Sequence, residues 1–95
     1  MPYMDIFAQL AQKIITAQKE VIGPLAIEQA RKVNGLNLGN SEKDVVCEGD
    51  KKQVINDLIK QYEGIFGLAS VEVCRDAVKD LLLELPKDQL PPLLA

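Results

Sequence analysis

Residues 5–22 carry the pattern that most limits how this chain can fold, because their apolar side chains recur at helical spacing. At about 100° per residue these positions fill an arc of about 180°, and polar side chains fill the other side. Asp5 stands where a carboxylate suits the positive end of a helix. Gly23-Pro24 follows, a pair that ends one helix and suits the first turn of the next. The pattern predicts an amphipathic helix from Asp5 to Ile22.

Two further helices are marked by their boundary residues as well as by their apolar spacing. One is predicted from Pro24 to Val33, where Asn34-Gly35 makes a natural stop. The other is opened by Asp50, whose carboxylate can accept the free N–H groups of the first turn. Gln53 stands at the spacing of a capping box, and Gly67 is placed to end this helix.

The remaining segments are a last helix, an insert and a tail. Ser70 is the expected cap of a helix from Val71 to about Leu85, which Pro86 ends. Residues 35–49 hold three glycines and several turn dipeptides, so we expect either an ordered loop or two very short paired strands. The tail at 86–95 is rich in Pro and Leu and cannot continue a regular helix.

These segments predict a mainly all-α fold. It is a four-helix arrangement with a short non-helical or two-stranded insert between the second and third helices. The chain has 95 residues, 47% of them apolar, and shows neither an internal repeat nor a linker between domains. We therefore expect a single helical domain over 1–95, with the Pro/Leu-rich tail at 86–95.

The residue types present leave little room for catalysis. The chain has no histidine, so histidine-based nucleophilic triads and histidine-containing zinc sites are excluded within one chain. No glycine-rich segment has the spacing of a phosphate loop, and the acidic residues Asp44, Glu48 and Asp50 lack the spacing of a calcium loop. Two carboxylates could still converge in space, but the sequence nominates no such pair. We expect no enzyme activity, no cofactor and no metal.

Charge and cysteine content bear on partners and compartment. The formal net charge is −3, and the basic pairs Arg31-Lys32 and Lys51-Lys52 are each flanked by acidic residues. Nucleic acids and anionic membranes both favour larger basic clusters, so we expect neither as a partner. No apolar run approaches the roughly 20 residues that span a bilayer. With no secretory signal pattern and two cysteines, the sequence predicts a cytoplasmic protein with reduced thiols.

Cys47 and Cys74 are the most reactive side chains in the chain, and each has two interpretations. A small-ligand or redox-sensing domain would use Cys47 in the insert, with Tyr62 near a pocket between helices, and its thiolate would react fast. Alternatively, both cysteines are small buried residues, and Tyr62 is a core residue with its hydroxyl at the rim.

The apolar surface favours a different function. The first helix carries a wider arc than the roughly 100° stripe that one supporting layer requires, and Leu83 falls on the polar side of its helix. Apolar patches on small domains mark interaction surfaces. We therefore expect a protein–protein interaction or oligomerisation module, most simply a homodimer; in the alternative, the tail folds back and covers Leu83. The predicted contact residues are Phe7, Leu10, Ile14, Leu83, Leu90, Leu93 and Leu94.

One short motif resembles a known family. Val21-Ile22-Gly23-Pro24-Leu25-Ala26, with a predicted helix on either side, is similar to the Gly-Pro-x-Ala helical segment appended to bacterial signalling proteins such as serine/threonine kinases and nucleotide cyclases. The family's run of basic residues after the motif is reduced here to Arg31 and Lys32. The resemblance implies a regulatory or partner-binding module and carries over no catalytic residue.

Overall fold

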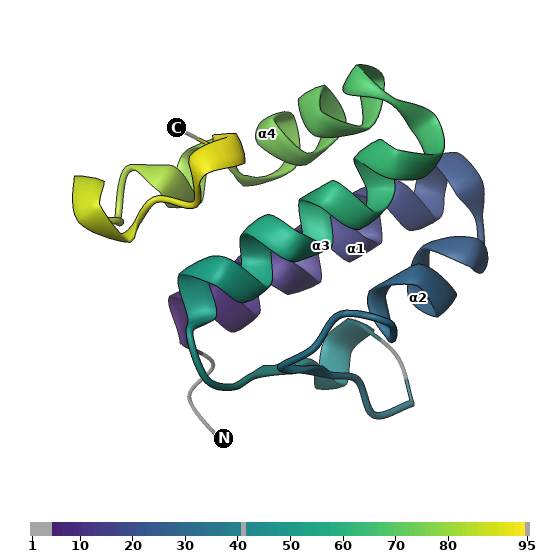
Figure 1. Cartoon of the computed structure of the whole chain (residues 1–95), viewed down its shortest axis with the longest axis horizontal. Helices are drawn as coiled ribbons and strands as arrows, with labels where there is room; N and C mark the ends of the chain where they lie inside the picture. Colours follow the sequence, from purple (N-terminus) through teal and green to yellow (C-terminus); the bar gives the residue numbers. More distant parts are fainter. Residues whose placement is uncertain (1–4, 41, 95) are drawn as a thin grey trace.

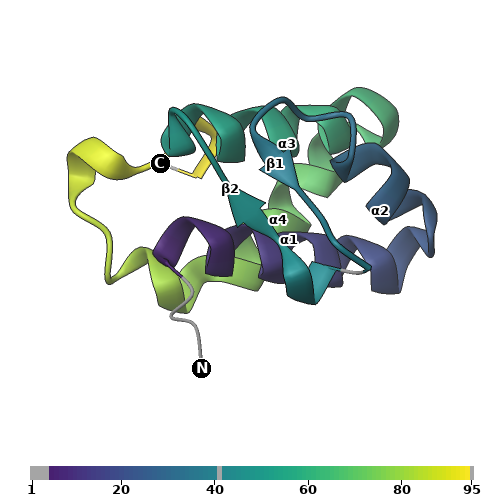
Figure 2. The ribbon, with the colours of Figure 1, turned by 90° about the horizontal axis from the view of Figure 1, so that it is seen from below.

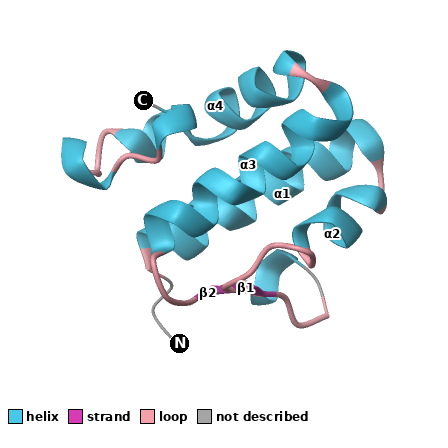
Figure 3. Cartoon of the chain, in the orientation of Figure 1, coloured by secondary structure: helices cyan, strands magenta, loops and turns pink. Residues whose placement is uncertain are grey.

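The computed structural model describes residues 5–40 and 42–94, and within them the predicted mainly helical fold is confirmed (Figure 1). Residues 1–4, 41 and 95, which fall inside the predicted single domain and its tail, lie outside this description. The two-stranded form of the insert is the one observed (Figure 3). In chain order the elements are α1 (Ile6–Ile22), α2 (Leu25–Ala30), β1 (Leu36–Asn37), the 3₁₀ turn η1 (Glu42–Asp44), β2 (Val46–Cys47), α3 (Lys51–Phe66), α4 (Leu68–Leu82) and the 3₁₀ turns η2 (Lys87–Gln89) and η3 (Pro92–Leu94).

An aspartate caps the N-terminus of both α1 and α3. The cap at Asp50 is the predicted one, whereas the sequence pattern placed Asp5 within the first helix. The Asp5 carboxylate accepts the Ala8 N–H at 2.8 Å, and the Asp50 carboxylate accepts the Gln53 N–H at 3.2 Å. Both side chains therefore satisfy a backbone donor that has no partner inside its own helix. The capping box is only half formed, because the Gln53 side chain bonds to Asp57 at 2.7 Å.

The last helix differs from its prediction. It starts at Leu68 and ends at Leu82, three residues earlier at each end than the apolar spacing suggested. Gly67, with φ of 74°, ends α3 and directly precedes α4, so the connection is a single residue. Ser70 lies inside α4 and is buried, so its predicted capping role is wrong. The second helix, unlike the last, is shorter than predicted and covers Leu25–Ala30.

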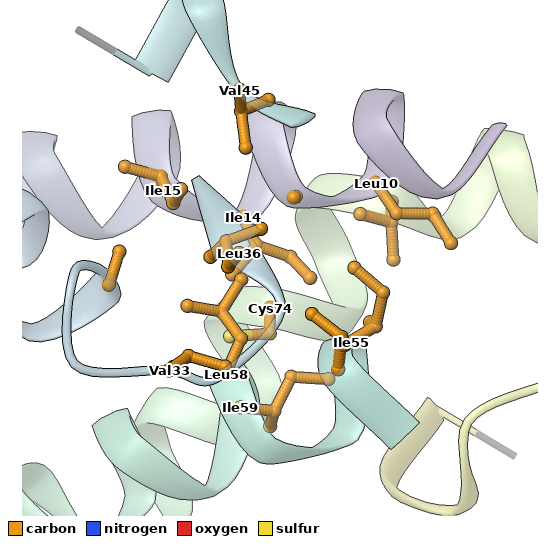
Figure 4. Packing of buried hydrophobic residues seen from close by; sticks show 14 of the residues in the cluster. Leu10, Ile14, Ile15, Val33, Leu36, Val45, Ile55, Leu58, Ile59 and Cys74 are labelled. Carbon is orange, nitrogen blue, oxygen red and sulfur yellow. The ribbon is translucent and has the colours of Figure 1, made fainter. Parts of the chain in front are cut away.

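Helix α1 occupies the middle of the fold. It packs against α2, α3, α4, β2 and η1, with α3 running in the same direction and α4 running back (Figure 1). Its apolar side chains meet those of α3, α4 and the insert in one cluster (Figure 4). Leu10, Ile14, Ile55, Leu58 and Ile59 are completely removed from solvent.

The insert closes one side of this cluster. β1 and β2 pair antiparallel, with Leu36 opposite Cys47, and lie across α1 (Figure 2). Leu36, Val45 and Cys47 are buried against the core. The turn before β1 requires glycine, since Gly35 has φ of 87° and a Cβ there would lie 2.7 Å from the Glu48 carbonyl oxygen.

The tail folds back on its own domain. Its second 3₁₀ turn contacts α3 and α4, and Pro91 and Leu94 are buried. The alternative in which the tail covers Leu83 is wrong, because Leu83 remains 88% exposed. The tail lies beside the first half of α3 instead, where Asn56 accepts a backbone N–H from it.

Tyr62 ties the short helix α2 to the core. Its ring is fully buried on α3, and its hydroxyl donates to the Ala26 carbonyl oxygen at 2.7 Å. The hydroxyl is therefore an interior group, in contrast to the predicted position at the rim. A helix of six residues is not stable by itself, so this bond to the core helps to hold α2 in place.

We predict that Tyr62→Phe lowers the free energy of unfolding by about 1–2 kcal/mol, because it removes one buried hydrogen bond and little volume. Urea denaturation followed by circular dichroism measures the change. The exposed substitution Glu28→Gln on α2 is the matched control and should change stability by less than about 0.5 kcal/mol. An unchanged midpoint for Tyr62→Phe would contradict the proposed tie.

Candidate functional site

The predicted contact residues on α1 lie in the core. Leu10 and Ile14 have no exposed surface, and Phe7 is half-buried and packs against the same cluster. The prediction that Leu10 and Ile14 contact a partner is therefore corrected, because a folded chain does not present them. The wide apolar arc of α1 is covered inside the chain, where neighbouring elements pack on several of its sides.

The predicted contact residues near the C-terminus are divided. Leu94 belongs to the tail, is buried against α3 and α4 and cannot reach a partner without tail movement, while Leu90 and Leu93 are half-buried. Leu83 is exposed as predicted, directly after α4 ends. The seven predicted residues therefore do not form one common surface.

A different apolar surface is exposed where α3 turns into α4. Ile65 and Phe66 are each 43% exposed and Leu68 is 68% exposed, on either side of Gly67. The last turn of α1 lies at the same end of the molecule (Figure 1), and Val21 in that turn is 65% exposed. We call Val21, Ile65, Phe66 and Leu68 the turn-end surface.

A buried hydrogen bond explains why Val21 and Leu68 are at the same end. The Gln18 side chain, one turn before Val21, donates to the Ser70 carbonyl oxygen at 3.0 Å, two residues after Leu68. Sequence reasoning missed this surface because Val21, Ile65 and Phe66 continue the apolar stripes of their helices. The only sequence signal was their position next to Gly23 or Gly67, where each helix runs out.

Cys47 has the environment of a buried structural thiol. It lies on β2 with 4% of its surface exposed, and its thiol donates to the Phe7 carbonyl oxygen at 3.8 Å. Burial raises the pKa of the Cys47 thiol to about 12, and the negative charge of Asp5 adds to this, against a smaller opposite effect of Lys51. Since the thiolate is the nucleophile, the site does not support a reactive cysteine.

The charges beside Cys47 are an ion pair that joins the starts of α1 and α3. Lys51 Nζ lies 2.9 Å from Asp5 Oδ2, and both side chains are about 40% exposed. Burial acts to raise the pKa of Asp5, but hydrogen bonds from Lys51 and the Ala8 N–H outweigh it and hold that pKa below its usual value. This pair is structural, and solvent limits its contribution to stability.

Cys74 and Tyr62 are also unsuited to reactive roles. Cys74 on α4 is fully buried and accepts a hydrogen bond from the Gln18 amide at 3.3 Å; burial raises the pKa of its thiol to about 11. Burial also raises the pKa of Tyr62, whose hydroxyl is already bonded to Ala26. Both cysteines are free thiols.

One open groove of about 450 Å³ lies between α1 and α4, and none of the predicted site residues lines it. Its walls carry amides, one lysine and one glutamate, and come from Gln9, Gln12, Lys13, Thr16, Ala17, Glu20 and Ala77. Within residues 5–40 and 42–94 no group of three or more acidic or cysteine side chains is placed to hold a metal ion. Over the same part of the chain, no helix has the length and hydrophobicity to cross a membrane.

Both thiols should react slowly with an aromatic disulfide reagent at pH 8. With a pKa of about 12, about one Cys47 thiol in ten thousand is ionised at that pH, and burial restricts access further. We expect labelling more than about a hundredfold slower than in the urea-unfolded chain, which serves as the control. Labelling of Cys47 faster than that of a free cysteine would contradict this structure of the site.

Stability should fall on the alkaline side. Cys47 keeps its proton in the folded state up to about pH 12 but loses it near 9 when unfolded, so its contribution is complete below about pH 9 and is lost as pH rises towards 12. Urea unfolding at pH 8 and pH 10.5 tests this in the wild type and in Cys47→Ala. We expect the wild type to lose more stability than the variant, by on the order of 1 kcal/mol. Equal losses would contradict the assignment.

Comparisons of the chain with known protein families, curated proteins and solved structures found no match. The similarity of Val21–Ala26 to the Gly-Pro-x-Ala segment therefore stays a prediction. Helices do flank Gly23-Pro24, since α1 ends at Ile22 and α2 begins at Leu25. A function for this chain has to be inferred from its own residues.

Proposed function

We propose that this chain is a protein–protein interaction module that pairs with a second copy of itself through the turn-end surface. The observation that carries the proposal is the exposure of Val21, Ile65, Phe66 and Leu68 at one end of the molecule. Single exposed apolar residues are ordinary on protein surfaces, but a group at one place marks an interaction site.

The composition of the turn-end surface suits the centre of an interface. Phe66 supplies an aromatic side chain of the kind that anchors binding sites, and the exposed aliphatic residues Ile65 and Leu68 stand close to it in the sequence. A standard interface buries about 800 Å² on each partner, which is more than four side chains provide. The polar side chains Lys19, Glu20 and Glu72, which flank the turn-end surface in sequence, would then form the polar rim.

A binding role also agrees with the state of the reactive groups. The two thiols are buried and protonated, and the Tyr62 hydroxyl is bonded within the core. We therefore propose a non-enzymatic cytoplasmic module. The helix-Gly-Pro-helix resemblance at Val21–Ala26 supports a regulatory role for it.

Light scattering behind a sizing column, over a range of protein concentrations, tests this proposal. We expect the mass to rise from that of the 10.5 kDa chain towards twice that value. Leu68→Glu should weaken dimerisation at least about tenfold, because it places a charge in the apolar centre of the interface. Leu83→Glu is the matched control, since Leu83 is even more exposed but lies at the other end of α4, and it should leave the mass unchanged.

A wild-type chain that stays monomeric at every concentration would overturn the proposed pairing. Equal effects of Leu68→Glu and Leu83→Glu would also contradict it, because they would place the contact elsewhere.

A further inference from the structure

The tail is held on α3 and α4 through its main chain. The Leu93 N–H donates to Asn56 Oδ1 at 2.9 Å, and the Leu93 carbonyl oxygen accepts from Arg75 Nε at 3.0 Å. Lys52 Nζ donates to the Asp88 carbonyl oxygen at 3.1 Å. Each of these bonds joins a helix side chain to a backbone atom of the tail. We call Lys52, Asn56 and Arg75 the seat; these side chains bind backbone atoms in the two 3₁₀ turns of the tail and none of its side chains.

The apolar part of the seat recognises a Pro-Pro-Leu-Leu turn. The Leu94 N–H donates to the Pro91 carbonyl oxygen at 2.9 Å, which closes a 3₁₀ turn. Side chains three residues apart lie on the same side of such a turn. Pro91 and Leu94 are accordingly both buried, while Pro92 between them is exposed. The tail thus offers two apolar side chains on one side and the backbone of Leu93 between them.

Asn56 indicates that the seat is built for this segment. It lies on the side of α3 that its sequence pattern marks as polar, yet only 4% of its surface is exposed. A buried amide is unfavourable unless it is hydrogen-bonded. The Oδ1 atom of Asn56 accepts its hydrogen bond from the Leu93 N–H. Arg75 on α4 binds the carbonyl oxygen of the same Leu93. Side chains from two helices therefore hold the backbone of one tail residue.

The tail is held less firmly in the fold than the two long helices against which it packs. It consists of two short 3₁₀ turns, and residues 83–86 connect it to the end of α4. The closed connection leaves Leu83 88% exposed, so opening it breaks little apolar contact of that side chain. A chain end of this kind opens at a lower free energy than a core helix.

We propose that the seat between α3 and α4, formed by Lys52, Asn56 and Arg75, is a docking site for a Pro-Pro-Leu-Leu turn. Its own tail fills it within one chain, and the tail of a second copy fills it between chains. The second copy is the occupant because its tail has the sequence that this seat already binds, and exchange preserves every contact of the tail. The seat lies at the other end of α3 from the turn-end surface, and the proposal does not depend on that surface.

A labelled peptide with the sequence of residues 86–95 tests the docking site by fluorescence polarisation. The titrated proteins are the full-length wild type and full-length Leu94→Asp, which releases its own tail. We expect the variant to bind the peptide at least about tenfold more tightly than the wild type, because the attached tail competes at high effective concentration. A peptide that itself carries Leu94→Asp is the control and should not bind.

Equal or absent binding by a Leu94→Asp chain that circular dichroism shows to be folded would overturn the docking site. Should that variant unfold, Leu94→Ala replaces it with the same expectation. Adding Asn56→Ala to the released chain should weaken peptide binding about tenfold, since it removes the acceptor for the Leu93 N–H. Unchanged affinity would show that the backbone is not what the seat recognises.

Exchange between chains is measured separately in the Leu68→Glu background, which lacks the turn-end contact. We expect light scattering to detect a dimer that grows with concentration and that disappears when Leu94→Asp is added. A Leu68→Glu chain that stays monomeric up to millimolar concentration would overturn the exchange. If the turn-end pairing fails and the exchange holds, the wild type forms a dimer that Leu68→Glu does not weaken. The two failures therefore give different results.

Discussion

The burial of α1 from several sides is the constraint on which the other elements depend. Leu10, Ala11, Ile14 and Ile15 are completely inaccessible to solvent, and the elements that cover them are α2, α3, α4, β2 and η1. An apolar arc of about 180° cannot be covered by one helix, because a single packing partner shields a stripe nearer 100°. The short helix α2 and the two-residue strands are stable because they complete this cover; alone, elements of that length would not persist.

The packing of other elements around α1 also decides where the molecule can interact. Among the described residues, large apolar side chains are exposed mainly at helix ends: in the last turns of α1 and α3, at the start of α4 and at Leu83 directly after it. Val46 on β2 is the exception. The turn-end surface is therefore a consequence of where the helices run out. At the other end of α3 the tail covers the apolar side chains, because Pro91 and Leu94 pack against α3 and α4. Both proposed interaction surfaces therefore lie towards the ends of α3, and neither covers the length of this helix.

Buried polar groups fix how these elements meet. Gln18 donates to the Ser70 carbonyl oxygen, Tyr62 donates to the Ala26 carbonyl oxygen, and Asn56 accepts the Leu93 N–H. Each joins two elements that are far apart in the sequence. Apolar contacts tolerate small shifts between helices, whereas a buried donor or acceptor without a partner is unfavourable. These three bonds therefore select one arrangement of α4, α2 and the tail around α1.

The sequence by itself determined what depends on neighbours along the chain: four helical stretches, the cap at Asp50, and the breaks at Gly23 and Gly67. The same periodicity could not show which apolar positions remain exposed, because an apolar stripe looks alike whether its last turn is covered or not. It therefore placed Leu10 and Ile14 at an interface, although both are fully buried. Only the tertiary structure decided that Asn56 is buried and Leu68 exposed. Burial is set by contacts between distant segments, and a local pattern contains no record of them.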